Sequence, residues 1–208
     1  MSSRGRFISL EGGEGVGKST QVKALAGALR QRGIDVVVTR EPGGSDGAEK
    51  IRELLLGGAE DRWTPEAEVL LFAAARADHV VRTIRPALER GQWVVSDRFA
   101  DSSLAYQGGA GGLGIETVRE INAFAVAGWF PDCTVVLKLD EGGERARARD
   151  IDGSDRIGGR SAQYHHKVET AFEIIAAEEP ERVKLIDASG SPEEVTARIF
   201  NAIEYLLP

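Results

Sequence analysis

Short apolar runs alternate along the chain with longer stretches of helical periodicity. Five brief runs are rich in β-branched residues and lie at 6–11, 35–39, 92–97, 133–139 and 182–187. Runs of this length and composition are typical of strands buried on both faces of a parallel sheet. Between them, helical spacing of apolar residues predicts helices over 18–32, 47–56, 65–90, 114–128, 140–150, 161–178 and 191–207. The 65–90 stretch is long enough to be one helix or two.

This alternation predicts an α/β fold, a doubly wound domain around a five-stranded parallel sheet. No internal repeat and no linker rich in Pro or Ser divides the sequence, so we expect residues 1–208 to form one domain. Two of the expected helices have clear start signals. Thr64-Pro65 and Ser191-Pro192 each place a capping hydroxyl before a first-turn proline, with a glutamate soon after.

Two glycine-rich segments, 106–114 and 150–161, are expected to be irregular. Both fit ordinary surface loops. The second is also charged and follows an arginine-rich stretch, which fits a lid over a binding site as well.

Composition narrows the range of partners. Hydrophobic residues make up 42% and charged residues 28% of the chain, and the formal net charge is −7. This balance is typical of a globular protein and gives no bulk electrostatic reason to bind nucleic acid or an anionic membrane. No segment is apolar enough for a signal peptide or a membrane span, which favours a cytoplasmic location. Cys133, the single cysteine, is expected to be a buried residue at a strand start.

The stretch GGEGVGKST carries the strongest chemical signal. It meets the pattern G-x-x-x-x-G-K-[ST], follows an expected strand and opens an expected helix. Glycines let several backbone N–H groups converge on phosphate oxygens, and a lysine reaches the β- and γ-phosphates. The predicted ATP-binding residues in this loop are Gly12, Gly13, Glu14, Gly15, Val16, Gly17, Lys18, Ser19 and Thr20.

Mg²⁺ is the expected cofactor of such a loop, and two residues are candidates to hold it. The Ser19 hydroxyl can bind the ion directly, and Asp97 ends a buried strand where a carboxylate can orient it. Asp97 on its own would fit a helix cap or a salt bridge equally well. The phosphate loop is what favours the metal site.

Three classes of phosphate-handling protein fit such a loop. A GTPase should carry an N-K-x-D guanine reader, but the chain has only Asn122 and Asn201, and neither precedes a lysine. An assembly or partition ATPase needs no second substrate pocket, whereas a small-molecule kinase does.

The polar and aromatic segment 97–109 follows a central strand, where open α/β sheets bind ligands. Phe72 and Arg76 share a helix face that could seat a nucleobase; alternatively Phe72 is in the core and Arg76 extends to solvent.

Four motifs carry a family resemblance: the phosphate loop, REPGG (40–44), FAAAR (72–76) and DRFADSSLAYQGG (97–109). Together they resemble the bacterial thymidylate kinases over nearly the whole chain. The resemblance implies transfer of the ATP γ-phosphoryl group to dTMP with Mg²⁺, in dTTP biosynthesis, by an enzyme that is usually a homodimer. A kinase for another nucleoside monophosphate is the nearest alternative, and a P-loop assembly ATPase is a more distant one.

The resemblance also implies how the acceptor's base and sugar are bound. Phe72 would stack on thymine, and Arg76 would lie against the base and hydrogen-bond to it. Ser103 and Gln107 would sit beside the base and sugar, and Tyr106 would crowd C2′ and disfavour ribonucleotides.

The remaining residues that are expected to bind dTMP are charged. Arg98 would bind the dTMP phosphate, and Arg40 and Glu41 would belong to a loop that closes the acceptor pocket. Glu14 is awkward beside phosphates, so we expect it to face the acceptor and take a hydrogen bond from the 3′-hydroxyl. The alternative is a purely structural carboxylate held by a nearby arginine. With Lys18, the expected catalytic residues are Glu14, Arg98 and Arg149.

Arg149 belongs to the expected lid, at about 145–160. The phosphate loop has no arginine at its variable positions, and family members of that kind resemble one another in supplying one from the lid. The lid offers Arg145, Arg147, Arg149, Arg156 and Arg160. We expect Arg149 to contact the transferring phosphate and Arg145 to pack near adenine. Two departures from the family pattern are Gly158, where a glutamate is common, and Phe172, where a tyrosine is common.

The long helix expected over 65–90 predicts that the chain pairs with a second copy of itself. Its apolar stripes exceed what one sheet face needs, and part of it is expected to form a symmetric dimer interface. The residues concerned are Val69, Leu70, Ala73, Ala77 and Val80.

Overall fold

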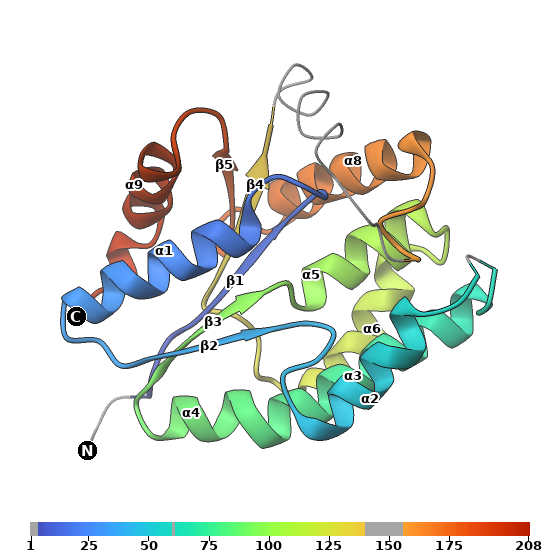
Figure 1. The fold of residues 1–208 in the computed structure, drawn as a ribbon, viewed down its shortest axis with the longest axis horizontal. Helices are drawn as coiled ribbons and strands as arrows, with labels where there is room; N and C mark the ends of the chain where they lie inside the picture. The colour runs from blue at the N-terminus through green and yellow to red at the C-terminus, as the bar shows by residue number, and fades with distance from the viewer. Residues whose placement is uncertain (1–3, 60, 140–155) are drawn as a thin grey trace.

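A computed structural model describes residues 4–59, 61–139 and 156–208, and in it five parallel strands form one sheet (Figure 1). The strands are β1 (Phe7–Gly12), β2 (Val36–Arg40), β3 (Trp93–Asp97), β4 (Cys133–Lys138) and β5 (Val183–Asp187). Their order is β2-β3-β1-β4-β5, so the phosphate-loop strand lies in the middle. The predicted five-stranded parallel sheet is confirmed, and Cys133 is buried at the start of β4 as expected.

Helices cover both faces of this sheet (Figure 1). The α-helices are α1 (Lys18–Gln31), α2 (Asp46–Leu56), α3 (Pro65–His79), α4 (Arg85–Glu89), α5 (Ala100–Ser103), α6 (Ile115–Val126), α8 (Ala162–Glu178) and α9 (Pro192–Ala202). Two π-helical segments, η1 (Val80–Ile84) and η2 (Leu104–Ala110), and a 3₁₀ turn, η3 (Glu204–Leu206), complete the described elements. The helix predicted over 140–150 lies outside the described residues. No helix in the described ranges is long and apolar enough to cross a membrane.

The two faces of the sheet have separate cores because successive strand residues point in opposite directions. Ile8 and Leu10 of β1 pack with α1 and α9 on one face. Phe7 of β1 packs with η1, α4 and Phe99 on the other face, and Val136 of β4 packs there with α8 and η2. The second face therefore carries more helices, and these helices build the walls of the site.

The edge strands correct one sequence expectation. β1, β3 and β4 are buried along their length apart from a residue at the end of β3 and of β4, but β2 and β5 show alternating burial. Val38 and Leu185 are 41% and 45% exposed, respectively. Continuous apolar sequence predicted strands buried on both faces, but a strand at the edge has helices over only part of its surface.

The stretch predicted as a helix over 65–90 is helical without a gap from Pro65 to Glu89 but changes its hydrogen bonding at η1. There the Arg85 N–H donates to the Val80 carbonyl, five residues back. Pro86 has no N–H for the carbonyl four residues before it, which accounts for the local widening. The helix starts as predicted, with the Thr64 hydroxyl accepting from the Ala67 N–H. Ser191 and Glu194 likewise form the predicted capping box of α9.

The first part of the glycine-rich segment 106–114 is not the surface loop that its composition indicated, whereas 111–114 is irregular and half-buried or exposed. Leu104–Ala110 is π-helical, and its residues Leu104 through Gly108 are buried. Gly111 closes the segment by donating its N–H to the Tyr106 carbonyl at 2.7 Å. Glycine here permits close packing: a Cβ at Gly109 would meet the Ala171 side chain of α8.

Candidate active site

The phosphate loop joins the end of β1 to the start of α1, and two glycines give it its shape. Gly12 has a φ of 132°, and a Cβ there would collide with the Leu137 carbonyl oxygen of β4. Gly17 has a φ of 92° and caps α1, whose N-terminal N–H groups face the loop. The Lys18 ammonium donates to the carbonyl oxygens of Gly13 at 2.5 Å and Gly12 at 3.3 Å. The lysine therefore folds back over the loop where an anion would lie.

The charge of Lys18 is unfavourable in this structure. Burial removes water from the ammonium, and the neighbouring Arg98 repels it, so the pKa of Lys18 is lowered to about 8. A bound polyphosphate would supply negative charge at this point and favour the ammonium form. The loop is thus a site for an anion in its electrostatics as well as in its shape.

Ser19 and Asp97, the two predicted metal ligands, are in direct contact. The Ser19 hydroxyl donates to Asp97 Oδ2 at 2.6 Å. They meet because β1 and β3 are paired, with Leu10 opposite Asp97, so the end of β3 lies beside the start of α1. A carboxylate and a hydroxyl beside a phosphate loop form an all-oxygen donor set, which fits Mg²⁺.

Arg98, the next residue, has a left-handed backbone with a φ of 70°. For a non-glycine residue this conformation costs about 1–2 kcal/mol and persists where neighbours enforce it. Here the Arg98 N–H donates to the Leu10 carbonyl at 2.9 Å, and the Ser96 hydroxyl donates to the Arg98 carbonyl at 2.7 Å. The turn directs the guanidinium back toward the phosphate loop, where Nη1 donates to the Gly12 carbonyl at 3.1 Å.

Arg98 also joins Glu14 to Tyr106. Arg98 Nη2 donates to Glu14 Oε1 at 2.6 Å and to the Tyr106 hydroxyl at 3.1 Å, and that hydroxyl donates to Glu14 Oε1 at 3.1 Å. Burial alone would raise the pKa of Glu14, but Arg98 and Lys18 outweigh it and lower that pKa to about 2. Glu14 therefore contacts two residues that are predicted to bind dTMP, and one of them is an arginine, as the structural alternative requires. Its bond to a 3′-hydroxyl stays a prediction.

On the base side, Arg76 is buried, with 1% of its surface exposed, so it does not extend to solvent. Its Nε donates to Glu41 Oε2 at 2.8 Å, and Nη2 donates to the Phe99 carbonyl and the Ser103 hydroxyl, both at 3.1 Å. Nη1 donates to Asn122 Oδ1. These bonds fix the guanidinium at the pocket wall.

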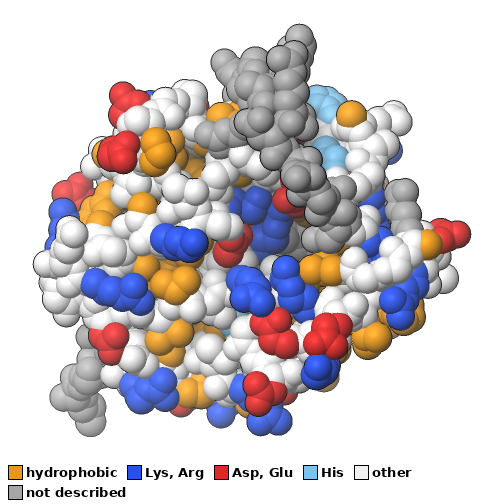
Figure 2. Space-filling model, in the orientation of Figure 1, with side chains coloured by type: hydrophobic (Ala, Val, Ile, Leu, Met, Phe, Trp, Pro, Cys, Tyr) orange, Lys and Arg blue, Asp and Glu red, His pale blue; other side chains and the backbone are white. Residues whose placement is uncertain are grey.

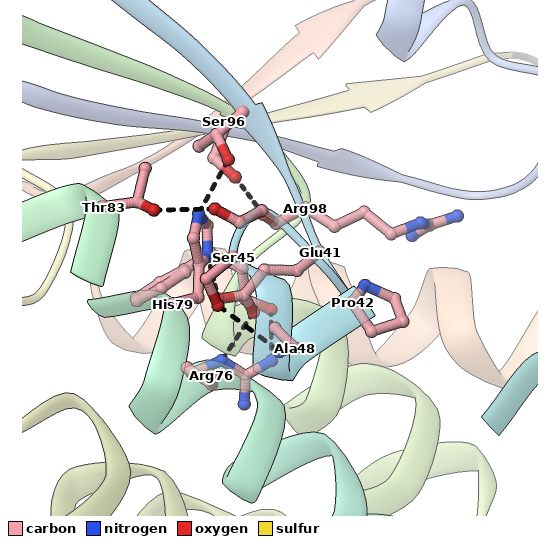
Figure 3. A network of polar contacts seen from close by, with 12 residues as sticks. Glu41, Pro42, Ser45, Ala48, Arg76, His79, Thr83, Ser96 and Arg98 are labelled. Atoms are coloured by element: carbon pink, nitrogen blue, oxygen red, sulfur yellow. Dashed lines mark hydrogen bonds and ion pairs between the residues drawn. The ribbon is translucent and has the colours of Figure 1, made fainter. Parts of the chain in front are cut away.

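Glu41 is part of the support for Arg76. Its other oxygen, Oε1, lies 2.9 Å from His79 Nδ1, and His79 Nε2 lies 2.7 Å from the Thr39 hydroxyl (Figure 3). His79 has no exposed surface, so it is structural. Figure 3 also shows the Arg98 side chain pointing away from this network. Arg40, by contrast, is exposed and paired with Glu49 at 3.1 Å.

Most of the phosphate loop and all of the predicted acceptor residues line a single cavity of about 440 Å³. Three predicted loop residues, Gly12, Gly13 and Val16, lie outside its lining. Lys18, Ser19 and Arg98 lie on its phosphate side, and Phe72, Ser103 and Gln107 on the other. Among the described residues, five cationic side chains line it, Lys18, Arg40, Arg52, Arg76 and Arg98, against the carboxylates of Glu14, Glu41 and Asp97. Figure 2 shows Lys and Arg side chains gathered around the central hollow of this face. A chain with net charge −7 thus has a locally basic cavity.

The lid arginines divide into two groups. Arg145, Arg147 and Arg149 lie outside the described residues. Arg156 and Arg160 are described, and both donate to Glu68 Oε2, at 2.5 and 2.7 Å. They belong to a buried ionic cluster at the start of α3. Phe172, a departure from the family pattern, is buried with its ring edge-on to Tyr106 at 6.5 Å between centroids.

Sequence reasoning missed several buried polar residues that support the site. Glu11 accepts from the Phe99 N–H at 2.7 Å and the Ser102 hydroxyl at 2.5 Å, and Ser102 in turn accepts from Arg98. Burial and the nearby charge of Asp101 raise the pKa of Glu11 to about 8. The available signal was a carboxylate inside an apolar strand, FISLEG. Glu68 and Asn122, each on an otherwise apolar helix face, gave the same kind of signal.

Comparisons with known proteins agree on one family. A family model described as thymidylate kinase matches residues 10–199. The chain is 61% identical to a thymidylate kinase of Rhizorhabdus wittichii over 206 residues, covering 98% of this chain and 99% of that protein. It is 47% identical to a thymidylate kinase of Bradyrhizobium diazoefficiens over 211 residues, covering 100% and 92%. Its fold is similar to the crystal structure of thymidylate kinase from Ehrlichia chaffeensis, with a TM-score of 0.80, 28% identity and coverage of 96% and 99%.

Proposed function

This chain belongs to the thymidylate kinase family, and we propose that its basic cavity is where the γ-phosphoryl group of ATP passes to dTMP, giving ADP and dTDP. It is a phosphotransferase acting on nucleotides. The observation that carries the assignment of the site is the single cavity shared by the phosphate loop and the acceptor residues. A P-loop assembly ATPase would not need the half of the cavity that the acceptor residues line.

In the proposed reaction, the phosphate loop and Lys18 hold the triphosphate, and Arg98 binds the phosphate of dTMP. A guanidinium binds a phosphate through two parallel N–H groups, which fixes its oxygens in line for attack. No general base is needed, because the attacking phosphate oxygen is already ionised. When bound beside Ser19 and Asp97, Mg²⁺ would neutralise charge on the triphosphate.

The nucleoside of dTMP lies in the other half of the cavity. Phe72, partly buried at the pocket wall, stacks on the base, and Arg76 and Gln107 face its polar edge. Tyr106 and Glu14, already joined by a hydrogen bond, meet the sugar, with Glu14 accepting from the 3′-hydroxyl. A hydroxyl at C2′ would crowd the Tyr106 ring, which favours deoxyribonucleotides.

A coupled assay of ADP release tests the reaction. We expect dTMP to be used in clear preference to dCMP, dGMP and dAMP, and no ADP release above background without an acceptor. ADP formed equally without any acceptor would indicate an ATPase. Preference for another monophosphate would identify a different kinase of the same group.

We also propose that the protein is a homodimer that pairs through α3 and α6. Val69, Ala73 and Val80 are buried in the monomer's own core, so the predicted stripe is only partly available. Leu70 of α3 is 57% exposed, and Phe124 of α6, a helix that packs on α3, is 90% exposed. Large apolar side chains exposed on two helices that pack together favour a surface that is covered in a dimer.

A further inference from the structure

Glu68 connects two parts of the molecule that the proposed reaction uses. It lies in the first turn of α3 and is only 2% exposed. Its Oε2 accepts from Arg156 and Arg160, which lie at the end of the lid sequence, and its Oε1 accepts from Gln107 Nε2 at 2.9 Å. Gln107 belongs to η2 and lines the acceptor cavity.

The two arginines compensate the buried charge of Glu68. Arg156 is itself anchored, because its Nε donates to the Leu55 carbonyl of α2 at 2.8 Å. Arg160 is 14% exposed at its side chain and lies over the Tyr164 ring at 4.6 Å. Both guanidinium groups donate to the carboxylate, and a carboxylate can only accept hydrogen bonds.

This property decides which way the Gln107 amide turns. Only its NH₂ group can bond to Glu68, so its carbonyl oxygen, Oε1, is the end left for a ligand. No group within residues 4–59, 61–139 and 156–208 bonds to that oxygen. The wall of the cavity therefore offers a hydrogen-bond acceptor at Gln107.

We propose that Glu68 is a positioning residue that makes the site select pyrimidines with an N–H at N3. Thymine and uracil carry a proton at N3 and can donate it to Gln107 Oε1. Cytosine has an unprotonated N3. Two hydrogen-bond acceptors, this nitrogen and Gln107 Oε1, would then face each other without a proton between them. The inference rests on the proposed function, because it takes the base to lie beside Gln107.

The isosteric variant Glu68→Gln gives a directional test. Arg156 and Arg160 still require an acceptor, so the new amide keeps its oxygen toward them and turns its NH₂ toward Gln107. Gln107 must then reverse and present its own NH₂ to the base. We expect the ratio of kcat/KM for dTMP to that for dCMP to fall about 10- to 100-fold, the range of one mispaired buried hydrogen bond.

Parallel measurements separate positioning from a general structural effect. The ratio of dTMP to dUMP should stay unchanged, because both bases carry the N3 proton. Glu66→Gln is the matched control, since Glu66 is exposed in the same helical turn. A folded Glu68→Gln enzyme that keeps its dTMP-to-dCMP ratio, or loses activity equally with all three substrates, would overturn the proposal. Failure of the unmodified enzyme to use dTMP would instead contradict the proposed function.

A measurement on the unmodified protein covers the case in which the variant does not fold. The side-chain NH₂ protons of Gln107, assigned by NMR, should exchange slowly with solvent in the absence of dTMP, because Glu68 already binds them. Exchange as fast as that of an exposed glutamine would disprove the fixed amide.

Discussion

Arg98 Nη2 and Glu14 Oε1 lie 2.6 Å apart, so the residues expected to bind the phosphate and the 3′-hydroxyl of dTMP are paired with each other. The pair balances charge in a partly buried cavity, and it lowers the pKa of Glu14 to about 2, so the carboxylate stays ionised at neutral pH. A phosphate that reaches Arg98 must share the guanidinium with Glu14 or displace it. Acceptor binding is therefore coupled to Glu14.

Glu14→Gln should weaken the use of dTMP more than that of ATP. The amide loses the charge that aligns Arg98 and is a poorer acceptor for the 3′-hydroxyl, so we expect the KM for dTMP to rise about 10-fold or more. Steady-state kinetics with each substrate varied in turn measure this. The exposed Glu116→Gln serves as control. An effect confined to ATP would contradict the assignment of Glu14 to the acceptor.

Asp97→Asn should raise the Mg²⁺ concentration needed for half-maximal activity, by about 10-fold or more, because a neutral amide is a poorer partner for a divalent cation. Activity measured across a Mg²⁺ titration at fixed ATP checks this. Asp187→Asn is a matched control, since Asp187 also ends a strand but is absent from the cavity lining. Identical Mg²⁺ curves for Asp97→Asn and the unmodified enzyme would exclude a metal role.

Arg149→Ala should lower kcat by about 10³-fold or more with little change in dTMP affinity, as removal of an arginine from a phosphoryl-transfer site does elsewhere. Arg156→Ala is the informative comparison. It removes a partner of the buried Glu68 and is expected to reduce thermal stability instead. If Arg147→Ala or Arg156→Ala produced the selective loss of kcat, the choice of Arg149 would be wrong.

Phe124→Glu should convert the proposed dimer to a monomer at micromolar concentration, because a charge would be buried against the partner's apolar surface. Sedimentation velocity of the two proteins measures this. Ile174→Glu provides the control, since Ile174 is an exposed apolar residue of α8, outside the proposed interface. A monomeric unmodified protein would refute the dimer.

The buried Glu11 predicts an unusual dependence of stability on pH. Its pKa is about 8 in the folded protein against 4.5 for the ordinary group. Between these values the folded state keeps a proton that the unfolded chain releases, so Glu11 makes the free energy of unfolding fall as pH rises from 4.5 to about 8.

Glu11→Gln stays neutral throughout and should lack this contribution. Relative to the unmodified protein, its free energy of unfolding should increase between pH 5 and pH 8, by up to a few kcal/mol. Urea denaturation of both ligand-free proteins at several pH values tests this. A difference between the two proteins that does not vary with pH would show that Glu11 titrates normally.

Local sequence signals were sufficient to predict the strands of the sheet, the phosphate loop and the chemical class. β-branched runs separated by amphipathic stretches allow few folds other than a parallel sheet covered by helices. The combination of Gly12, Gly17 and Lys18 at this spacing is specific to loops that bind phosphate. The spacing of local signals is enough for such features because helix periodicity, capping and loop geometry act over a few residues. Ser19 and Asp97 were both expected to bind Mg²⁺; they are in contact because the strands that precede them are paired, and their role as metal ligands stays a prediction.

Which buried polar groups face each other depends on the tertiary packing and could not be predicted from the sequence. Glu11, Glu68 and Asn122 are far from their partners in sequence, and their apolar surroundings hid them among core residues. Tertiary packing also makes the first part of segment 106–114, which has the composition of a loop, a buried end of the π-helix Leu104–Ala110. A buried charge or amide must find its partner across the fold, because water is not available to it, and no local pattern records that choice.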